Sequence, residues 1–389
     1  MTPAARLAAA IEVLDRVLTG VPAEQALTTW GRAHRFAGSG DRHALRDLVF
    51  AALRCRRSFA ALGGGLTGRG LVLGLVRASG QDPDRLFTGQ GHAPAVVQPD
   101  EVGRVPVGEE ALDVPDWLAP RLQGSLGGDY AAILQALQHR APVFLRVNLA
   151  RISRDKAVAR LAQDGILAEA VSWVKTAIKV TENERKIQTS STYLAGLVEL
   201  QDAASQAVIA ALDLAPGLRV LDYCAGGGGK ALAMAAAGAV VDAHDANPQR
   251  MAGLPDRAAR AGVPVRIVAD PAVTSPYDLV LMDVPCSGSG SWRRDPPGKW
   301  ALTPDSLAAL VAVQARILDR CVPLVAPGGA LAYATCSLLA DENEAQIAGF
   351  LARHPGWTAS FQTRFTPLQG GDGFFVAKLS QCDEISAQP

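Results

Sequence analysis

Apolar positions in the first ninety residues of this 389-residue chain recur at helical spacing. One series runs from Leu7 to Val17 and a second from Leu45 to Leu53, as expected for helices that bury one face. A passage rich in glycine, proline and acidic residues follows, from about 89 to 115. The pattern predicts an all-helical N-terminal domain over 1–90 and a linker over 91–115.

Strands and helices alternate through the rest of the chain. A strand at 143–148, a helix that begins at Ser153 and a strand-like stretch at 177–180 predict a small α+β subdomain over 116–200. From about Gln201 onward, repeated βα units predict a parallel sheet with helices on both faces, and ligands then bind beyond the carboxyl ends of the strands. We expect this α/β domain to span 201–380, before a tail at 381–389.

Composition excludes several classes of protein. Hydrophobic residues make up 49% of the chain and charged residues 20%, which is typical of a soluble globular protein. No apolar run approaches the ~20 residues of a membrane span, and the N-terminus does not resemble a signal peptide. Six cysteines occur without metal-like spacing, which favours a reducing compartment. We therefore expect a cytoplasmic protein without membrane contact, disulfides or metal, and we further expect a monomer.

Charge is distributed unevenly although the formal net charge is zero. Residues 1–90 contain 12 arginines and 7 acidic residues, a formal charge of +5. A local basic surface suits contact with phosphate groups. The alternative is that arginine simply replaces lysine, since no lysine precedes Lys156. Charge alone leaves both interpretations open.

A loop without bulky side chains connects the strand at 218–223 to the helix that begins at Lys230. Its backbone can approach a ligand closely, and the helix N-terminus offers N–H groups to a carboxylate or phosphate. Asp245 ends the next strand, where an acid can hold a ribose diol, and Asp270 follows the third strand. An ATP-binding P-loop is excluded, because Ala231 follows the lysine and Ala225 stands five residues before it. A dinucleotide site and a purely structural turn both remain open.

Two cysteines lie in turn sequences directly after predicted strands: Cys286 in DVPCSG (283–288) and Cys336 in TCS (335–337). A thiolate can add reversibly to C6 of a pyrimidine, and this addition makes C5 nucleophilic. We expect Cys55, Cys321 and Cys382 to be small buried packing residues, which is common for cytosolic cysteine.

These two motifs resemble those of the RNA cytosine-C5 methyltransferases of the RsmB/Sun/Fmu type, within the NOP2/Sun family. The likeness extends over about 250 residues and includes APVFLRVN (141–148), QDAASQ (201–206) and GDGFF (371–375). In the helical part, GDR (40–42) and LVF (48–50) resemble the NusB-type RNA-binding domain. The resemblance implies a Rossmann-like class I methyltransferase domain preceded by an RRM-like α+β subdomain and an all-helical NusB-like domain.

The resemblance also implies a role for each site residue. Cys336 would attack C6, Cys286 would assist product release, and Asp283 would hold and activate the cytosine. The cofactor would be S-adenosylmethionine, with its amine near Asp222, its ribose on Asp245, and Lys230 near the cofactor or the base-site acid. Further cofactor contacts are expected from Cys224, Ala225, Gly226, Gly227, Gly228, Gly229, Arg250, Asp270 and Asp283.

The segment 291–300, SWRRDPPGKW, is interpreted as an RNA-contacting loop because arginine and tryptophan can bind phosphate and stack on unpaired bases. Its candidate residues are Arg293, Arg294, Lys299 and Trp300, although a solvated loop with one packed tryptophan is the simpler alternative. One departure from the family lies in the glycine loop, where Gly226 and Gly227 replace a small residue and a proline. A less preorganised loop is expected to weaken cofactor binding without abolishing it.

The sequence thus predicts a methyltransferase that modifies C5 of cytosine in RNA through a covalent cysteine adduct. Small-subunit 16S ribosomal RNA, naked or in an early ribosomal particle, is the expected substrate. A transfer-RNA methyltransferase and a non-catalytic RNA-binding assembly factor are the alternatives. A DNA cytosine methyltransferase fits less well, because those enzymes resemble a design without the second, Thr-Cys-Ser motif.

Overall fold

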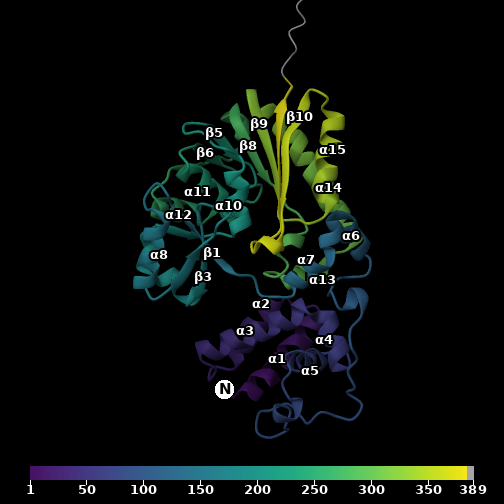
Figure 1. Cartoon of the computed structure of the whole chain (residues 1–389). Helices are drawn as coiled ribbons and strands as arrows, with labels where there is room; N and C mark the ends of the chain where they lie inside the picture. The colour runs from purple at the N-terminus through teal and green to yellow at the C-terminus, as the bar shows by residue number, and fades with distance from the viewer. Residues whose placement is uncertain (383–389) are drawn as a thin grey trace, which may run out of the picture. The chain divides into compact units, whose positions relative to one another are not determined.

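The computed structural model describes residues 1–382, so most of the expected tail at 381–389 lies outside the described residues. The chain forms two compact units (Figure 1). The first contains Met1–Arg140 and, from much later in the chain, Trp292–Leu302. The second contains Ala141–Ser291 and the chain from Thr303 onward. The segment 292–302, called the excursion below, therefore leaves the second unit and belongs to the first.

The first unit is helical, as the spacing of apolar residues predicts. Its helices are α1 (Pro3–Leu18), α2 (Ala23–Ala33), α3 (Ser39–Arg54), α4 (Arg56–Gly63), α5 (Gly68–Ala78), α6 (Ala119–Leu126), α7 (Tyr130–Leu137) and α13 (Pro296–Ala301). Thr2 begins α1 by accepting a hydrogen bond from the Ala5 N–H at 3.1 Å, with proline at the first helical position. Apolar faces of α1, α2, α3 and α5 form one buried core.

Within residues 1–382, no single helix has the length and apolar composition of a membrane span. The bent pair α4 and α5 meets that test only in combination, and α5 contributes Leu71, Val72 and Leu73 to the core of the first unit.

The segment predicted as a linker is packed onto the helices instead. Arg69 forms an ion pair with Glu101, and Arg77 donates a hydrogen bond to the Glu101 carbonyl at 2.9 Å. Gly103 lies so close to the Leu62 carbonyl that a Cβ atom there would sit 1.8 Å from its oxygen. Helices α6 and α7 cluster with the first unit, and the first strand of the α+β subdomain, β1, begins at Val143. The glycine and proline content of this segment predicted its lack of helices and strands, but it did not predict that the segment packs against the helices.

The second unit begins with a four-stranded antiparallel sheet in the order β2-β3-β1-β4. The chain order is β1 (Val143–Val147), α8 (Arg154–Gln163), β2 (Leu167–Ala170), β3 (Ala177–Glu182), α9 (Ser191–Leu194) and β4 (Val198–Leu200). This βαββαβ arrangement is the ferredoxin-like topology, to which RRM domains also conform. The expectation of an RRM-like subdomain is confirmed for this part of the chain.

A seven-stranded sheet in the order β10-β11-β9-β8-β5-β6-β7 forms the rest of the second unit. Its strands are β5 (Arg219–Asp222), β6 (Val240–Ala243), β7 (Val265–Ile267), β8 (Tyr277–Asp283), β9 (Val325–Thr335), β10 (Trp357–Phe365) and β11 (Phe374–Gln381). The five strands from β5 to β9 are parallel, as predicted from the βα repeats. The last two strands pair antiparallel and were not predicted.

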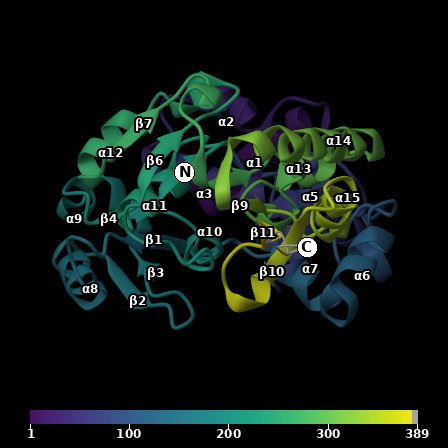
Figure 2. The same cartoon turned by 90° about the horizontal axis from the view of Figure 1, so that it is seen from above.

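Helices cover both faces of this sheet. On one face, α10 (Ala203–Ala210), α11 (Gly229–Ala236) and α12 (Leu254–Ala261) share a core with alternate strand residues such as Leu279 and Leu281. On the other, α14 (Pro304–Cys321) and α15 (Glu344–Arg353) pack on Val280 and Met282. Figures 1 and 2 show α14 and α15 together on one side of the strands and α10 on the other. Because successive side chains of β8 point to opposite faces of the sheet, this strand contributes residues to both cores.

Asp113 is fully buried in the first unit and accepts hydrogen bonds from the N–H groups of Arg57 and Ser58, the Ser58 hydroxyl and the Gln138 amide. Asp113→Ala should lower the free energy of unfolding by about 3 kcal/mol, because four buried donors lose their acceptor. Urea unfolding of the full chain measures this. Asp113→Asn is the matched control and should cost less, since it keeps one oxygen and tolerates the positive φ of 52°. Equal stability of the alanine variant and the unsubstituted protein would contradict the prediction.

Candidate active site

A cavity of about 420 Å³ opens in the second unit beyond the carboxyl ends of β5, β8 and β9. The lining includes Asp222, Lys230, Asp283, Cys286 and Cys336, which the sequence places far apart. Parallel strands bring their carboxyl ends to one edge of the sheet, so three motifs converge there. The further lining residues are Gln201, Ser205, Cys224, Ala225, Gly226, Gly227, Gly229, Arg250, Val284 and Pro285.

The glycine loop between β5 and α11 turns tightly enough to form the floor of this cavity. Gly228 has a φ of 78°, and a Cβ atom there would lie 2.3 Å from a methyl carbon of Leu254. Glycine is therefore required at this position both for the backbone conformation and for the close packing of α12. Gly226 also has a positive φ, of 53°.

Asp222 ends β5 and is 1% exposed. Within the described residues, neither of its carboxyl oxygens has a hydrogen-bond partner. The pKa of this carboxyl is raised to about 7, mainly by burial and in part by the charge of the nearby Asp283, while Lys230 opposes the shift. A buried acid without a partner, lining a cavity, is suited to a cationic ligand group.

Lys230 and Asp283 form a partly buried ion pair with Nζ and Oδ2 2.6 Å apart. Burial alone would lower the pKa of Lys230, but the charge and hydrogen bond of Asp283 outweigh it and the net shift is upward. The ammonium group also lies 4.9 Å from the centre of the Phe374 ring. The pair therefore holds one positive and one negative group in fixed positions at the cavity wall.

Cys286 and Cys336 face each other with their Sγ atoms 3.4 Å apart. All six cysteines of the chain are free thiols, so this is a contact and not a disulfide. The hydrogen bond with Cys336 raises the pKa of the Cys286 thiol well above its usual value, and burial adds to the shift. Cys321 is buried in the core as expected, whereas Cys55 is half-buried and Cys382 is exposed, which corrects the prediction of burial for the latter.

Asp245 braces the glycine loop from behind. One oxygen accepts hydrogen bonds from the Gly226 N–H at 2.9 Å and from Arg250 at 3.0 Å, and the other accepts from the Asn247 N–H. The side chain is buried and is not part of the cavity lining, whereas Arg250 is. Asp270 is exposed and caps a short turn at the Ala272 N–H, away from the lining residues. The structure therefore favours a capping role for Asp270.

The sequence analysis did not identify Gln201 and Ser205 as lining residues, although both belong to the QDAASQ motif. Arg146 of β1 donates to the Gln201 side chain and to the Gly229 carbonyl at 2.7 Å. The ferredoxin-like sheet therefore supports the start of α11 directly. Spacing along the chain holds no signal for such a contact, because the partners are separated by more than fifty residues.

The loop predicted to contact RNA is used largely inside the first unit. Lys299 Nζ donates to the Arg54 carbonyl at 3.0 Å, Trp300 Nε1 donates to the Leu53 carbonyl at 2.6 Å, and Arg54 donates to the Arg293 carbonyl. The lysine and tryptophan satisfy the last carbonyls of α3, which lack partners within the helix. Lys299 and Arg293 are buried, so the structure gives them a role in packing rather than a free surface for RNA. Arg294, in contrast, is exposed.

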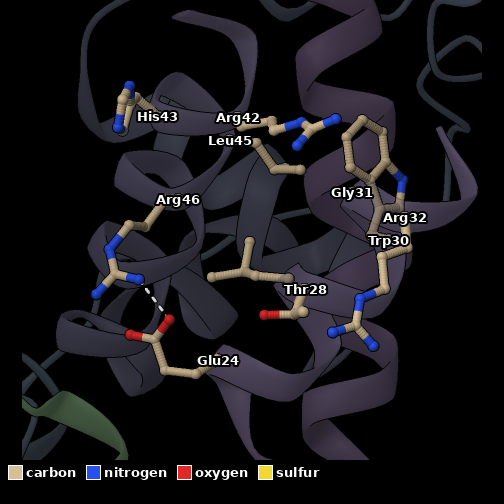
Figure 3. A pocket seen from close by; sticks show the side chains of 10 residues that line it. Glu24, Thr28, Trp30, Gly31, Arg32, Arg42, His43, Leu45 and Arg46 are labelled. Carbon is tan, nitrogen blue, oxygen red and sulfur yellow. Dashed lines mark hydrogen bonds and ion pairs between the residues drawn. The ribbon is translucent and has the colours of Figure 1, made fainter. Parts of the chain in front are cut away.

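A basic hollow of about 560 Å³ lies between α2 and α3 (Figure 3). Arg32, Arg42, His43 and Arg46 line it together with Glu24, which forms an ion pair with Arg46. The excess of arginine in the N-terminal sequence therefore includes one local cluster of positive charge.

Two family models match parts of this chain. A family model described as 16S rRNA methyltransferase RsmB/F matches residues 209–380, and one for the RsmF/B-like ferredoxin-like domain matches 114–188. Ribosomal RNA small subunit methyltransferase B of Xylella fastidiosa is 35% identical over 306 residues, which cover 73% of this chain and 71% of that protein. The protein of the same name from Sodalis glossinidius is 37% identical over 284 residues, covering 68% and 65%.

The chain belongs to the RsmB/F methyltransferase family. A crystal structure of a methyltransferase homolog protein from Pyrococcus horikoshii shares the fold, with a TM-score of 0.61, 26% identity, and coverage of 69% of this chain and 96% of that one. This RsmB/F family member is an S-adenosylmethionine-dependent RNA methyltransferase. The unpartnered Asp222 fits the methionine ammonium of that cofactor, and the close-packed glycine loop leaves room for it beside the backbone.

Asp222→Asn should stabilise the protein and weaken the binding of S-adenosylmethionine. The folded-state pKa of about 7 lies above the unfolded value of about 3.9, so the carboxyl favours folding only at low pH and this contribution is lost as pH rises through 7. The melting temperature should rise by about 2–4 °C at pH 8 and by less at pH 5. Cofactor affinity, measured by calorimetry, should fall at least about tenfold.

Asp270→Asn is the matched control, because this exposed cap does not line the cavity. It should leave cofactor affinity unchanged. A lower melting temperature for Asp222→Asn at pH 8 would contradict the account of a strained, unpartnered acid.

Proposed function

We propose that this enzyme methylates C5 of a cytosine in 16S ribosomal RNA through a covalent bond between Cys336 and C6. The observation that carries the proposal is the contact of two thiols, 3.4 Å apart, at a cavity wall that also holds the Lys230–Asp283 pair. Methylation of a base nitrogen or of a ribose hydroxyl requires no thiol. The names of the relatives from Xylella fastidiosa and Sodalis glossinidius support ribosomal RNA as the substrate.

The first step is the addition of Cys336 to the ring. The sulfur forms a bond to C6, and the electron pair of the C5=C6 double bond becomes available at C5 and toward N3 and O2. The Cys286 thiol lies within hydrogen-bonding distance of Cys336 and, with its raised pKa, keeps its proton. It can therefore donate to a Cys336 thiolate and stabilise the attacking group.

Asp283 is the residue to which we assign recognition of the cytosine edge. Its carboxyl is 30% exposed, so one side can face the base while Oδ2 is held by Lys230. Negative charge develops at N3 and O2 during addition, and a carboxyl that shares a proton there lowers the barrier. Lys230 fixes the direction of this carboxyl.

The bound cofactor supplies an electrophilic methyl group to C5. Afterwards the C5 proton must leave before the C6–sulfur bond can break and restore the aromatic ring. Once Cys336 is a thioether, the largest cause of the raised pKa of Cys286 is removed, although burial still opposes the thiolate. Cys286 can then pass its proton to solvent and accept the C5 proton as a thiolate. The two cysteines thus act in sequence on adjacent ring atoms.

RNA contacts outside the cavity are assigned to the first unit. The basic hollow between α2 and α3 (Figure 3) offers the guanidinium groups of Arg32 and Arg42 to phosphates, whereas Arg46 is paired with Glu24. Arg294 is exposed on the excursion 292–302. The NusB-like character predicted for these helices supports this assignment.

Purified enzyme, labelled S-adenosylmethionine and 16S ribosomal RNA from a strain that lacks this gene provide the direct test. Label is expected in 5-methylcytosine at one position, identified by nucleoside mass spectrometry and mapping. Label in transfer RNA alone would redirect the proposal to the other substrate class. Absence of 5-methylcytosine from every RNA would overturn it.

Exchange of either cysteine should separate the two chemical roles. Cys336→Ala should reduce turnover to background, because no other described thiol is in contact with Cys286. Cys286→Ala should still add to the base and transfer methyl but release product slowly, leaving a protein–RNA adduct that survives denaturing electrophoresis. Exposed Cys382, changed to Ser, is the matched control and should turn over normally. The opposite pattern of adducts would reverse the two roles.

A further inference from the structure

A fully buried carboxyl group lies beneath the two thiols and belongs to neither cysteine motif. Glu342 is 0% exposed, and its segment follows β9 by a few residues. Its backbone carbonyl accepts a hydrogen bond from Tyr333 at 2.6 Å, which ties it to the strand that leads to Cys336. Such an acid is costly to bury unless its oxygens are fully satisfied.

Both oxygens of Glu342 are occupied, and the donors come from both cysteine loops. Oε1 accepts from the Ser287 N–H at 2.8 Å and from the Gln314 amide of α14 at 3.0 Å. Oε2 accepts from the hydroxyls of Ser287 and Ser337. Ser287 directly follows Cys286, and Ser337 directly follows Cys336. One carboxyl group therefore bridges the residues next to the two reactive thiols.

Further hydrogen bonds align the same two loops. Asn343 accepts from the Thr335 hydroxyl at 2.6 Å and donates to the Ser337 carbonyl at 2.9 Å, so it braces the turn around Cys336. The Gly290 N–H donates to the Cys336 carbonyl at 2.9 Å. The hydroxyls of Ser287 and Ser337 also contact each other at 3.3 Å, and the Ser289 hydroxyl contacts both of them. Among the described residues, Glu342 is the carboxyl group that this serine cluster surrounds.

We propose that Glu342 is a positioning residue that holds the Cys286 and Cys336 loops together, so that both sulfur atoms reach adjacent carbons of one pyrimidine ring. This inference rests on the proposed function for its chemical meaning, but the bridge itself is a property of the free protein. The pairing of β8 with β9 sets where the two loops leave the sheet. Contacts between the loops, to which Glu342 adds the carboxylate, then set how closely their side chains approach. A displacement of about 1 Å in such a site costs up to roughly a hundredfold in rate.

Glu342→Gln tests the bridge with little change in volume. The glutamine amide keeps one oxygen for the Ser287 N–H and the Gln314 amide, but its NH₂ group replaces the oxygen that accepts from the Ser287 and Ser337 hydroxyls. Both hydroxyls therefore lose a charged acceptor and must reverse their direction, which weakens the bridge. We expect kcat to fall by roughly 10- to 100-fold while the KM for S-adenosylmethionine stays within about twofold, since Glu342 does not line the cavity. Glu344→Gln is the matched control: this exposed acid two residues away pairs with Arg364 and should leave kcat unchanged.

A second readout needs no methyl transfer. Diamide takes one hydrogen from each of two thiols, leaving a disulfide and the reduced hydrazine, and the rate for Cys286 with Cys336 reports how well the sulfurs are aligned. Glu342→Gln should slow formation of this disulfide by about tenfold, as followed by peptide mass mapping, while Glu344→Gln should match the unsubstituted enzyme. If the unsubstituted enzyme proves not to make 5-methylcytosine, this rate still tests the bridge.

Ser287→Ala provides a second variant should Glu342→Gln fail to fold, which loss of cofactor binding and a lowered melting temperature would reveal. It removes one hydroxyl donor and leaves the other donors to Glu342 in place. A smaller loss of kcat together with slower disulfide formation supports the proposal. Unchanged kcat and an unchanged diamide rate in either folded variant would overturn it.

Discussion

The parallel pairing of β8 with β9 is the constraint on which the active site depends. Asp283 lies opposite Ala334 in this pairing, so the two strands end side by side and their loops leave the sheet at the same edge. This pairing brings the Cys286 and Cys336 loops to the same place, although fifty residues separate the two thiols along the chain. The sheet core that holds the pairing is buried on both faces, so the strand ends are the least mobile support that the fold offers.

The three acidic residues at and beside the cavity differ in their hydrogen-bond and ion-pair partners. Asp222 is buried without a hydrogen bond among the described residues, whereas Asp283 is neutralised by Lys230 and Asp245 is used to brace the glycine loop. Three acids at the ends of neighbouring strands thus have three different environments. Of the three, only Asp222 is buried without a hydrogen-bond partner among the described residues, so only Asp222 requires a cationic ligand. We therefore propose that it binds the cofactor ammonium.

Local signals in the sequence were sufficient for the βα units, the glycine loop and both cysteine motifs, because each depends on neighbours within a few residues. They were not sufficient for β10 and β11, which pair antiparallel at the far edge of the sheet. The burial of Lys299 also depends on a long-range contact that local signals do not contain. A basic residue in a loop is expected to meet solvent, and only the tertiary structure shows that it caps α3 inside the first unit.

The sequence by itself determined the chemistry of this protein: two thiols after strands, an acid and a lysine at known strand or helix ends, and a loop that a backbone-binding ligand can approach. The tertiary structure decided which of these groups interact. It brought the thiols within 3.4 Å, left Asp222 without a partner and placed Glu342 between the two cysteine loops. Residue type sets what a side chain can do, whereas burial and long-range pairing set its partners, and neither can be read from spacing along the chain.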